Sequence, residues 1–172
     1  MTLIDTILKR RSVRRYTNDA IPEEKLNKIL QAGLLAPTSR NLKPCEFYVV
    51  KDKSVLEKLS KAKKAGAGML AGCAAAVVVL GDSEKADTWV EDSSIALSFM
   101  MLMAEEQGIG NCWVQIHLRS NADGNDAEQI VREILSVPEK FRVVGILSLG
   151  IPVEAPEPHS IDEADISKVH MI

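Results

Sequence analysis

The chain has 172 residues, 46% of them hydrophobic, and a formal net charge of -3. It is long enough to bury a hydrophobic core and too apolar for an intrinsically disordered protein, so we expect one domain over residues 1–172 with an acidic tail over about 153–172. The net negative charge argues against nucleic acid as the main partner, because proteins that bind nucleic acid usually carry a net positive field.

The first predicted element is an amphipathic helix over residues 3–11, in which apolar residues recur at helical spacing. It leads into a basic run, Lys9–Tyr16, with five cationic side chains in seven positions. Cations in the last turn of a helix complement its dipole, which accounts for the first three but not for Arg14 and Arg15. Because guanidinium forks and the hydroxyl of Ser12 suit a phosphate group, the run predicts a site for a phosphate-bearing cofactor.

A second helix is predicted after Pro22, which suits a first helical turn, and it must end before Pro37. The loop that follows, residues 36–44, is bounded by prolines and rich in side chains that form hydrogen bonds. A strand over residues 46–51 comes next. This loop is therefore a second candidate for ligand contacts.

A capping box at residues 54–57 predicts a third helix that reaches about Lys64. Residues 66–71 then match the dinucleotide pattern G-x-G-x-x-A. That pattern must follow a strand and open a helix, whereas here a helix precedes it and an apolar strand over 74–80 follows. We interpret residues 66–71 as a flexible connection and not as a dinucleotide site.

The second half of the chain contains a long helix over about 85–107, buried on most sides, and a short strand over 110–116. A turn over 121–125, a last helix closed by Pro138 and an apolar strand over 142–150 follow. This order of elements predicts an α/β or α+β fold: a mixed central sheet covered by helices in a three-layer arrangement.

The tail beyond Pro152 is acidic and contains few apolar residues. It cannot form a core by itself, so we expect it to be either disordered or laid across another surface. Arg15 has two open interpretations, as a ligand contact or as a salt-bridge partner for this tail.

No targeting segment or membrane span is predicted. Asp5 stands where a signal peptide needs an apolar segment, and the longest apolar runs, residues 70–80 and 95–104, are shorter than the ~20 residues of a membrane helix. We therefore expect a cytoplasmic protein without a membrane partner.

The three cysteines form no C-x-x-C pair and are odd in number, which argues against a disulfide framework or a zinc site. Cys112 and His117 could be read as a nucleophile and its base, but no third partner is visible near them. We expect all three cysteines to be buried or incidental, and we expect no metal.

Four motifs occur in a fixed order: the basic residues 10–14 after a helix, the loop 36–44 before a strand, the Gly-Ile-Gly-Asn-Cys-Trp turn at 108–113, and Gly-Ile-Pro at 150–152. Together they resemble the FMN-dependent nitroreductase family, from residue 3 to about residue 158. The resemblance implies an α+β homodimer with FMN held in two sites at the subunit interface. It also implies that the C-terminal tail is exchanged between the subunits.

The resemblance further implies which residues bind FMN. The basic motif would grip the phosphate and ribityl chain, with Arg14 near the pyrimidine edge of the flavin, and the loop would reach the isoalloxazine of the other subunit. No catalytic side chain is required, because the flavin carries the chemistry. The implied cofactor-binding residues are Arg10, Arg11, Ser12, Arg14, Pro37, Thr38, Ser39 and Asn41.

Two positions depart from the family pattern. Cys45 follows Pro44 where an aromatic residue is common, and the tail offers only His159 and Lys168 where many members place a cation that completes the phosphate grip. The chain is also short, so we expect an open and permissive substrate pocket.

The implied function is a ping-pong oxidoreductase that passes a hydride from NADH or NADPH through flavin N5 to a nitroaromatic, quinone or similar electron-poor acceptor. One alternative is another flavin reaction, such as dehalogenation, ene reduction or flavin breakdown. A second alternative is a nonenzymatic module that binds anions or nucleic acid through Arg10–Arg15.

Overall fold

The computed structural model of the protein describes residues 2–172. The α-helices are α1 (Leu3–Lys9), α2 (Glu23–Leu34), α3 (Lys53–Ser60), α4 (Trp89–Glu106) and α5 (Ala127–Leu135). The strands are β1 (Cys45–Val50), β2 (Ala75–Asp82), β3 (Gly110–Gln115) and β4 (Phe141–Gly150). Short 3-10 turns lie at η1 (Ser39–Asn41), η2 (Gly68–Gly72), η3 (Ile161–Glu163) and η4 (Ile166–Lys168).

The sheet confirms the α+β class and corrects one detail of the prediction. Its strands lie in the order β1-β2-β4-β3, and each neighbouring pair is antiparallel, so the sheet is not mixed. The reason is that β4 inserts between β2 and β3, which both run against it. Among residues 2–172, the only parallel pairing is an isolated bridge between Ser12 and Asn111.

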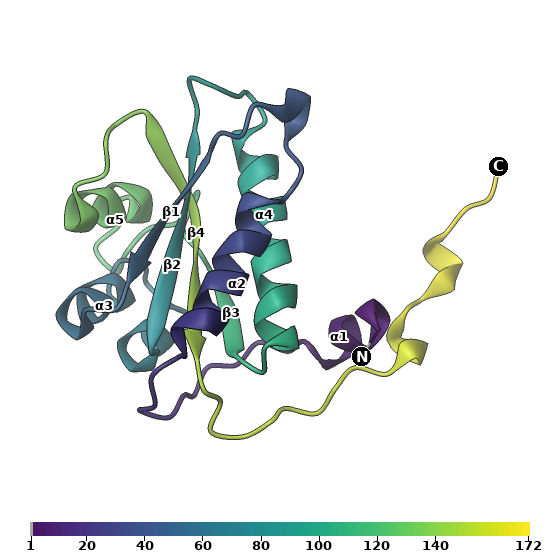
Figure 1. Cartoon of the computed structure of the whole chain (residues 1–172). Coiled ribbons are helices and arrows are strands. Elements are labelled where there is room, and N and C mark those ends of the chain that lie inside the picture. Colours follow the sequence, from purple (N-terminus) through teal and green to yellow (C-terminus); the bar gives the residue numbers. More distant parts are fainter. Residues whose placement is uncertain (1) are drawn as a thin grey trace.

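Helices cover both faces of the sheet in three layers (Figure 1), with α2 and α4 on one face and α3, η2 and α5 on the other. The central strand β2 is buried along its whole length, which explains why its sequence is continuously apolar instead of alternating. One apolar cluster lies under α3 and α5, and includes Leu56 and Val131. The other lies under α2 and α4, and includes Leu26 and Met100.

Two local predictions were wrong. The N-cap of α3 is Asp52, whose carboxylate accepts hydrogen bonds from the backbone of Ser54 at 2.8 Å and of Val55 at 3.1 Å, so the predicted capping box does not form. The predicted flexible connection at residues 66–71 is a packed 3-10 turn that buries Leu70 completely. The long helix is confirmed as α4, although it begins at Trp89.

The acidic tail, residues 153–172, extends away from the body of the molecule past α1 (Figure 1). It is almost entirely exposed and touches its own chain at few points, one of which is the hydrogen bond from His159 N to Leu8 O at 2.8 Å. Within residues 2–172, no helix has the length and apolar character needed to cross a membrane.

Candidate cofactor site

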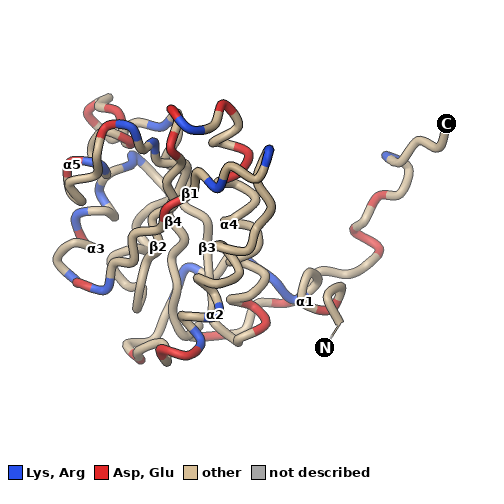
Figure 2. The backbone as a smooth tube through the Cα atoms, turned by 45° about the horizontal axis from the view of Figure 1, so that its top comes forward, with Lys and Arg blue, Asp and Glu red and all other residues tan. Residues whose placement is uncertain are grey.

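The basic segment after α1 lies against the edge of the sheet and is joined to it by two isolated bridges, Ser12–Asn111 and Tyr16–Pro152. Val13 N donates to Asn111 O at 2.9 Å, and Thr17 N donates to Ile151 O at 2.8 Å. Val13 is buried while Ser12 and Arg14 are exposed. Because side chains alternate along extended backbone, Ser12 and Arg14 face the same side, toward solvent. Figure 2 shows basic residues in blue where α1 joins the body.

Two glycines allow this close approach. A Cβ added to Gly110 would lie 2.9 Å from Cγ1 of Val13, and one added to Gly150 would lie 2.7 Å from the ring of Tyr16. Real Cβ atoms essentially never come so near another heavy atom. Gly110 and Gly150, from the motifs at 108–113 and 150–152, therefore make room for the basic segment, which is more than ninety residues away in sequence.

Tyr16 attaches the C-terminal end of the basic segment to strand β4 through its hydroxyl group. Its hydroxyl donates to Val13 O at 2.6 Å and lies 2.7 Å from Oγ of Ser148. Burial holds the pKa of Tyr16 well above its ordinary value, so the phenol stays neutral and keeps its proton for the hydrogen bond.

A pocket of about 370 Å³ opens beside the segment and is lined by residues 12–15 and 154–156. Arg15 lies 3.8 Å from the carboxylate of Glu154, which agrees with the second of its two interpretations, a salt bridge to the tail. Arg11 donates to the backbone carbonyl of Glu157. Within the described residues, no carboxylate lies within ion-pair distance of Arg10 or Arg14, which leaves their guanidinium groups available to an anion.

The loop before β1 has a strained backbone. Arg40, Asn41 and Lys43 have positive φ angles of 51°, 54° and 50°, which is uncommon for residues other than glycine. The hydroxyl of Thr38 accepts from Lys43 N at 3.0 Å and so closes the loop. Strain of this kind is found at ligand-binding sites, where the surrounding structure must maintain it.

Asp92 in the first turn of α4 maintains this loop, although no sequence motif marks it as a site residue. Its carboxylate is buried and accepts hydrogen bonds from Ser39 N at 2.8 Å and from Oγ1 of Thr88 at 3.1 Å. The pairing joins residues 53 positions apart in sequence, so no local pattern could reveal it.

The two predicted sets of site residues lie at opposite ends of α4 (Figure 1). Ser39 is bonded to Asp92 near the start of the helix, whereas Arg10 lies near Glu105 at its end, where burial raises the pKa of Glu105 and the charge of Arg10 opposes this shift. Thirteen helical residues span about 20 Å. The pocket at residues 12–15 contains no residue of the loop, so one chain brings together only half of the predicted set.

The cysteines follow the expected pattern in part. Cys73 and Cys112 are buried, while Cys45 is half-buried with its sulfur 3.7 Å from Oγ of Ser93. His117 packs edge-on against Trp89 and lies 3.5 Å from Glu128. Among residues 2–172, no cluster of three or more His, Cys, Asp or Glu side chains could hold a metal ion.

The family model described as the nitroreductase family matches residues 7–67 and 62–151. The chain belongs to the nitroreductase family. An Archaeoglobus fulgidus protein named "Putative NADH dehydrogenase/NAD(P)H nitroreductase" is 35% identical over 91% of this chain and 89% of its own. The NADPH-flavin oxidoreductase of Vibrio harveyi is 30% identical over 90% of this chain and 67% of its own.

A solved structure of an FMN-dependent nitroreductase from Clostridium difficile R20291 is 42% identical, with a TM-score of 0.94 and 98% coverage of both chains. At that coverage only about three residues of this nitroreductase-family chain remain unmatched, so most of the extended tail is part of the shared fold. The predicted family membership is confirmed.

Proposed function

We propose that this nitroreductase-family protein is a single-domain, homodimeric FMN oxidoreductase that uses NADH or NADPH to reduce nitroaromatics, quinones or similar electron-poor acceptors by a ping-pong mechanism. The observation that carries the proposal is the pocket beside Ser12 and Arg14, whose guanidinium group has no carboxylate partner among residues 2–172. The names of the similar proteins, which mention FMN, flavin and NAD(P)H, support the same cofactor and reductant.

The residues present fit a flavin nucleotide. Arg10 and Arg14 have no carboxylate partner among residues 2–172, and Arg14 donates through Nη1 only to the carbonyl of Ser12 at 3.3 Å, so their remaining N–H groups can bind the phosphate and the flavin edge. The exposed hydroxyl of Ser12 adds a short neutral donor. Arg11 is oriented by the tail through the carbonyl of Glu157. When bound, FMN supplies the hydride acceptor and donor, and the protein positions substrates against it.

Arg14 has a second role under this proposal. A fixed guanidinium near the pyrimidine edge stabilises negative charge there, and so favours the reduced cofactor over the oxidised one. The loop residues Pro37, Thr38, Ser39 and Asn41 complete the site from the second subunit. Within one chain the loop is bonded to Asp92 at the start of α4, whereas the basic segment is bonded to Asn111, beyond the end of that helix.

An exposed apolar face is the surface on which we place the second copy. Leu3, Ile4 and Ile7 of α1 are 67%, 48% and 44% exposed, and Phe99 of α4 is 41% exposed. A mostly apolar groove of about 390 Å³ runs between α1 and α4. Covering such a face removes apolar surface from water, and the extended tail is long enough to cross onto the partner.

The cellular setting follows from the chemistry. Reduced nicotinamide nucleotides are small soluble reductants, so we place the protein in the cytoplasm, with a small-molecule acceptor as its partner and no nucleic acid or membrane. The acidic net charge fits this assignment.

The test is the visible spectrum of the purified full chain, with the flavin identified after heat release. We expect a yellow protein that releases FMN, oxidises NADH or NADPH with a panel of acceptors, and migrates as a dimer in light-scattering chromatography. A monomer that binds FMN tightly would refute the shared site. A colourless protein that takes up no FMN, yet binds DNA with steep salt dependence, would refute the enzyme assignment.

A further inference from the structure

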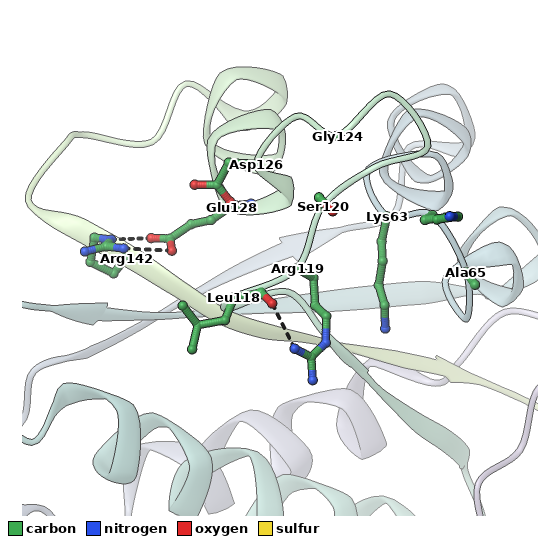
Figure 3. Close-up of a pocket in the computed structure, with 10 residues that line it drawn as sticks. Lys63, Ala65, Leu118, Arg119, Ser120, Gly124, Asp126, Glu128 and Arg142 are labelled. Carbon is green, nitrogen blue, oxygen red and sulfur yellow. Dashed lines mark hydrogen bonds and ion pairs between the residues drawn. The ribbon is translucent and has the colours of Figure 1, made fainter.

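A second and larger pocket, of about 640 Å³, lies on the α3–α5 side of the sheet (Figure 3). One wall is formed by residues 63–65 after α3 and 118–120 after β3, which are joined by the hydrogen bond from Lys64 N to Ser120 O at 3.0 Å. The opposite wall is formed by Asp126, Glu128 and Arg142. None of these residues lines the pocket at residues 12–15.

Two of the three charged side chains on the second wall are paired with each other. The carboxylate of Glu128 is buried and accepts from both Nε and Nη2 of Arg142 and, at 3.1 Å, from Val143 N. Asp126 caps α5 by accepting from Glu128 N at 2.9 Å. Arg142 therefore offsets the charge of Glu128, and the carboxylate of Asp126 has no ion-pair partner among residues 2–172, so this wall attracts no anion and a bound anion must rely on the first wall.

The first wall carries two cations that lack an acidic partner. Figure 3 shows the side chains of Lys63 and Arg119 extending side by side into the same space. Burial, and then the neighbouring charge of Arg119, lower the pKa of Lys63. Within the described residues, no carboxylate forms an ion pair with either of them. Like charges held together repel, and an anion between them would remove that repulsion.

Arg119 is oriented by a strained residue at the rim of the pocket. Leu118 has a positive φ of 57° and is 78% exposed, which is unusual for a bulky apolar residue. Its carbonyl accepts from Nη1 of Arg119 at 2.8 Å and so orients the guanidinium. The rim therefore offers an apolar surface directly beside two cations.

We propose that Lys63 and Arg119 bind the anionic group, a carboxylate or a phosphate, of a small molecule whose apolar part packs on Leu118. Under the proposed function this molecule is either an electron acceptor that carries a carboxylate or a nicotinamide nucleotide that carries an additional phosphate. The inference rests on the proposed function only for that choice of ligand.

The test uses equilibrium calorimetry on the purified full chain with its bound flavin. The probes are para-nitrobenzoate with its neutral counterpart para-nitrobenzamide, and NADP+ with its less charged counterpart NAD+. The pocket variants are Lys63→Met and Arg119→Met. The control is Lys58→Met, which removes an exposed lysine of α3 outside the pocket.

We expect each pocket variant to raise the Kd of at least one anionic probe by about tenfold, with no change for its counterpart or in the control. The probe that responds identifies the source of the anionic group. Lys63→Arg and Arg119→Lys keep the charge and should keep the affinity, which separates lost binding from lost folding.

Three results overturn the proposal: no preference of the unmodified protein for either anionic probe, no change of Kd in both pocket variants, or an equal loss in Lys58→Met. Calorimetry needs no turnover, so a protein that binds a probe at this pocket but oxidises no NADH or NADPH refutes the proposed function and leaves the pocket assignment standing.

Discussion

The backbone N–H of Ser39 donates a 2.8 Å hydrogen bond to the buried carboxylate of Asp92. This contact ties a loop with three left-handed residues to the first turn of the longest helix. The loop is thereby fixed to α4, which suits its proposed contact with a second subunit.

Asp92→Ala should destabilise the protein by about 2 kcal/mol, because it leaves Ser39 N and the hydroxyl of Thr88 without their acceptor. It should also weaken FMN binding by at least about tenfold if the loop completes the site. Urea unfolding and fluorescence titration with FMN measure both. Asp87→Ala, which removes an exposed ion pair with Arg40, is the matched control and should change stability by less than about 1 kcal/mol. Unchanged FMN affinity in Asp92→Ala would exclude the loop from the site.

Gly150→Ala should destabilise by about 1–3 kcal/mol, because the new methyl group would lie 2.7 Å from the ring of Tyr16 and push the basic segment off the sheet. Gly72→Ala is the control, since nothing lies within 4 Å of a Cβ there and φ is not positive. The control should be neutral or slightly stabilising. Urea midpoints of the two variants test this, and equal midpoints contradict the proposed close approach.

Arg14→Ala should lower FMN affinity by about tenfold or more and lower the reduction potential of the bound flavin, with little effect on stability because the side chain is exposed. Arg14→Lys should retain part of both effects. Lys58→Ala removes an exposed cation of α3 that does not line this pocket and serves as the control. A potential that is the same in Arg14→Ala and the unmodified protein removes the electrostatic role of Arg14.

The Glu128–Arg142 pair should make stability depend on pH. Burial alone would raise the pKa of Glu128, but the hydrogen bonds from Arg142 and Val143 N outweigh it and hold the pKa below the ordinary 4.5. A lowered pKa means that the stabilisation is complete above about 4.5 and is lost as the pH falls through the folded-state pKa. Glu128→Gln should therefore be less stable by about 1–3 kcal/mol near neutral pH, with the difference shrinking in acid. Urea midpoints at several pH values measure this.

The control for this pair is Glu57→Gln, because Glu57 forms an exposed pair with Lys61 on α3. Its stability should follow that of the unmodified protein at every pH. A constant difference between Glu128→Gln and the unmodified protein from neutral to acidic pH contradicts the assignment.

Phe99→Glu should convert the proposed dimer to a monomer and reduce FMN content, because it places a charge on the apolar face of α4. Val49→Glu is the control. Val49 is 39% exposed, against 41% for Phe99, but it lies on β1, an edge strand of the sheet, and not on α1 or α4. Chromatography with light-scattering detection measures the molar mass, and so the oligomeric state, of both variants. A dimer that survives Phe99→Glu contradicts this choice of interface.

Local signals in the sequence located most elements, because apolar periodicity and helix-capping residues act within a few positions. These local signals were less reliable where two neighbouring residues could both cap the same helix. Asp52 and Ser54 are both of a type that favours the N-cap position. In the structure Asp52 is the N-cap of α3, because its carboxylate accepts hydrogen bonds from the backbone N–H groups of Ser54 and Val55. The direction of strand pairing also escaped prediction, since it depends on β4 entering between β2 and β3.

The candidate site divides in the same way. The residue types of the basic segment and of the loop, and their order along the chain, were enough to predict an anion site and the nitroreductase family. The supports of the site were not visible: Asp92 under the loop and Gly150 under Tyr16 act across 53 and more than 130 positions of sequence.

The sequence by itself therefore determined which side chains are available, the α+β class and the family, because these depend on residue types and their spacing. Only the tertiary structure decided that the loop of Ser39 and the basic segment lie at opposite ends of α4, and that Lys63 and Arg119 share a pocket. The physical reason is that these relationships arise from how distant segments pack on the sheet, and packing is set by the whole core at once.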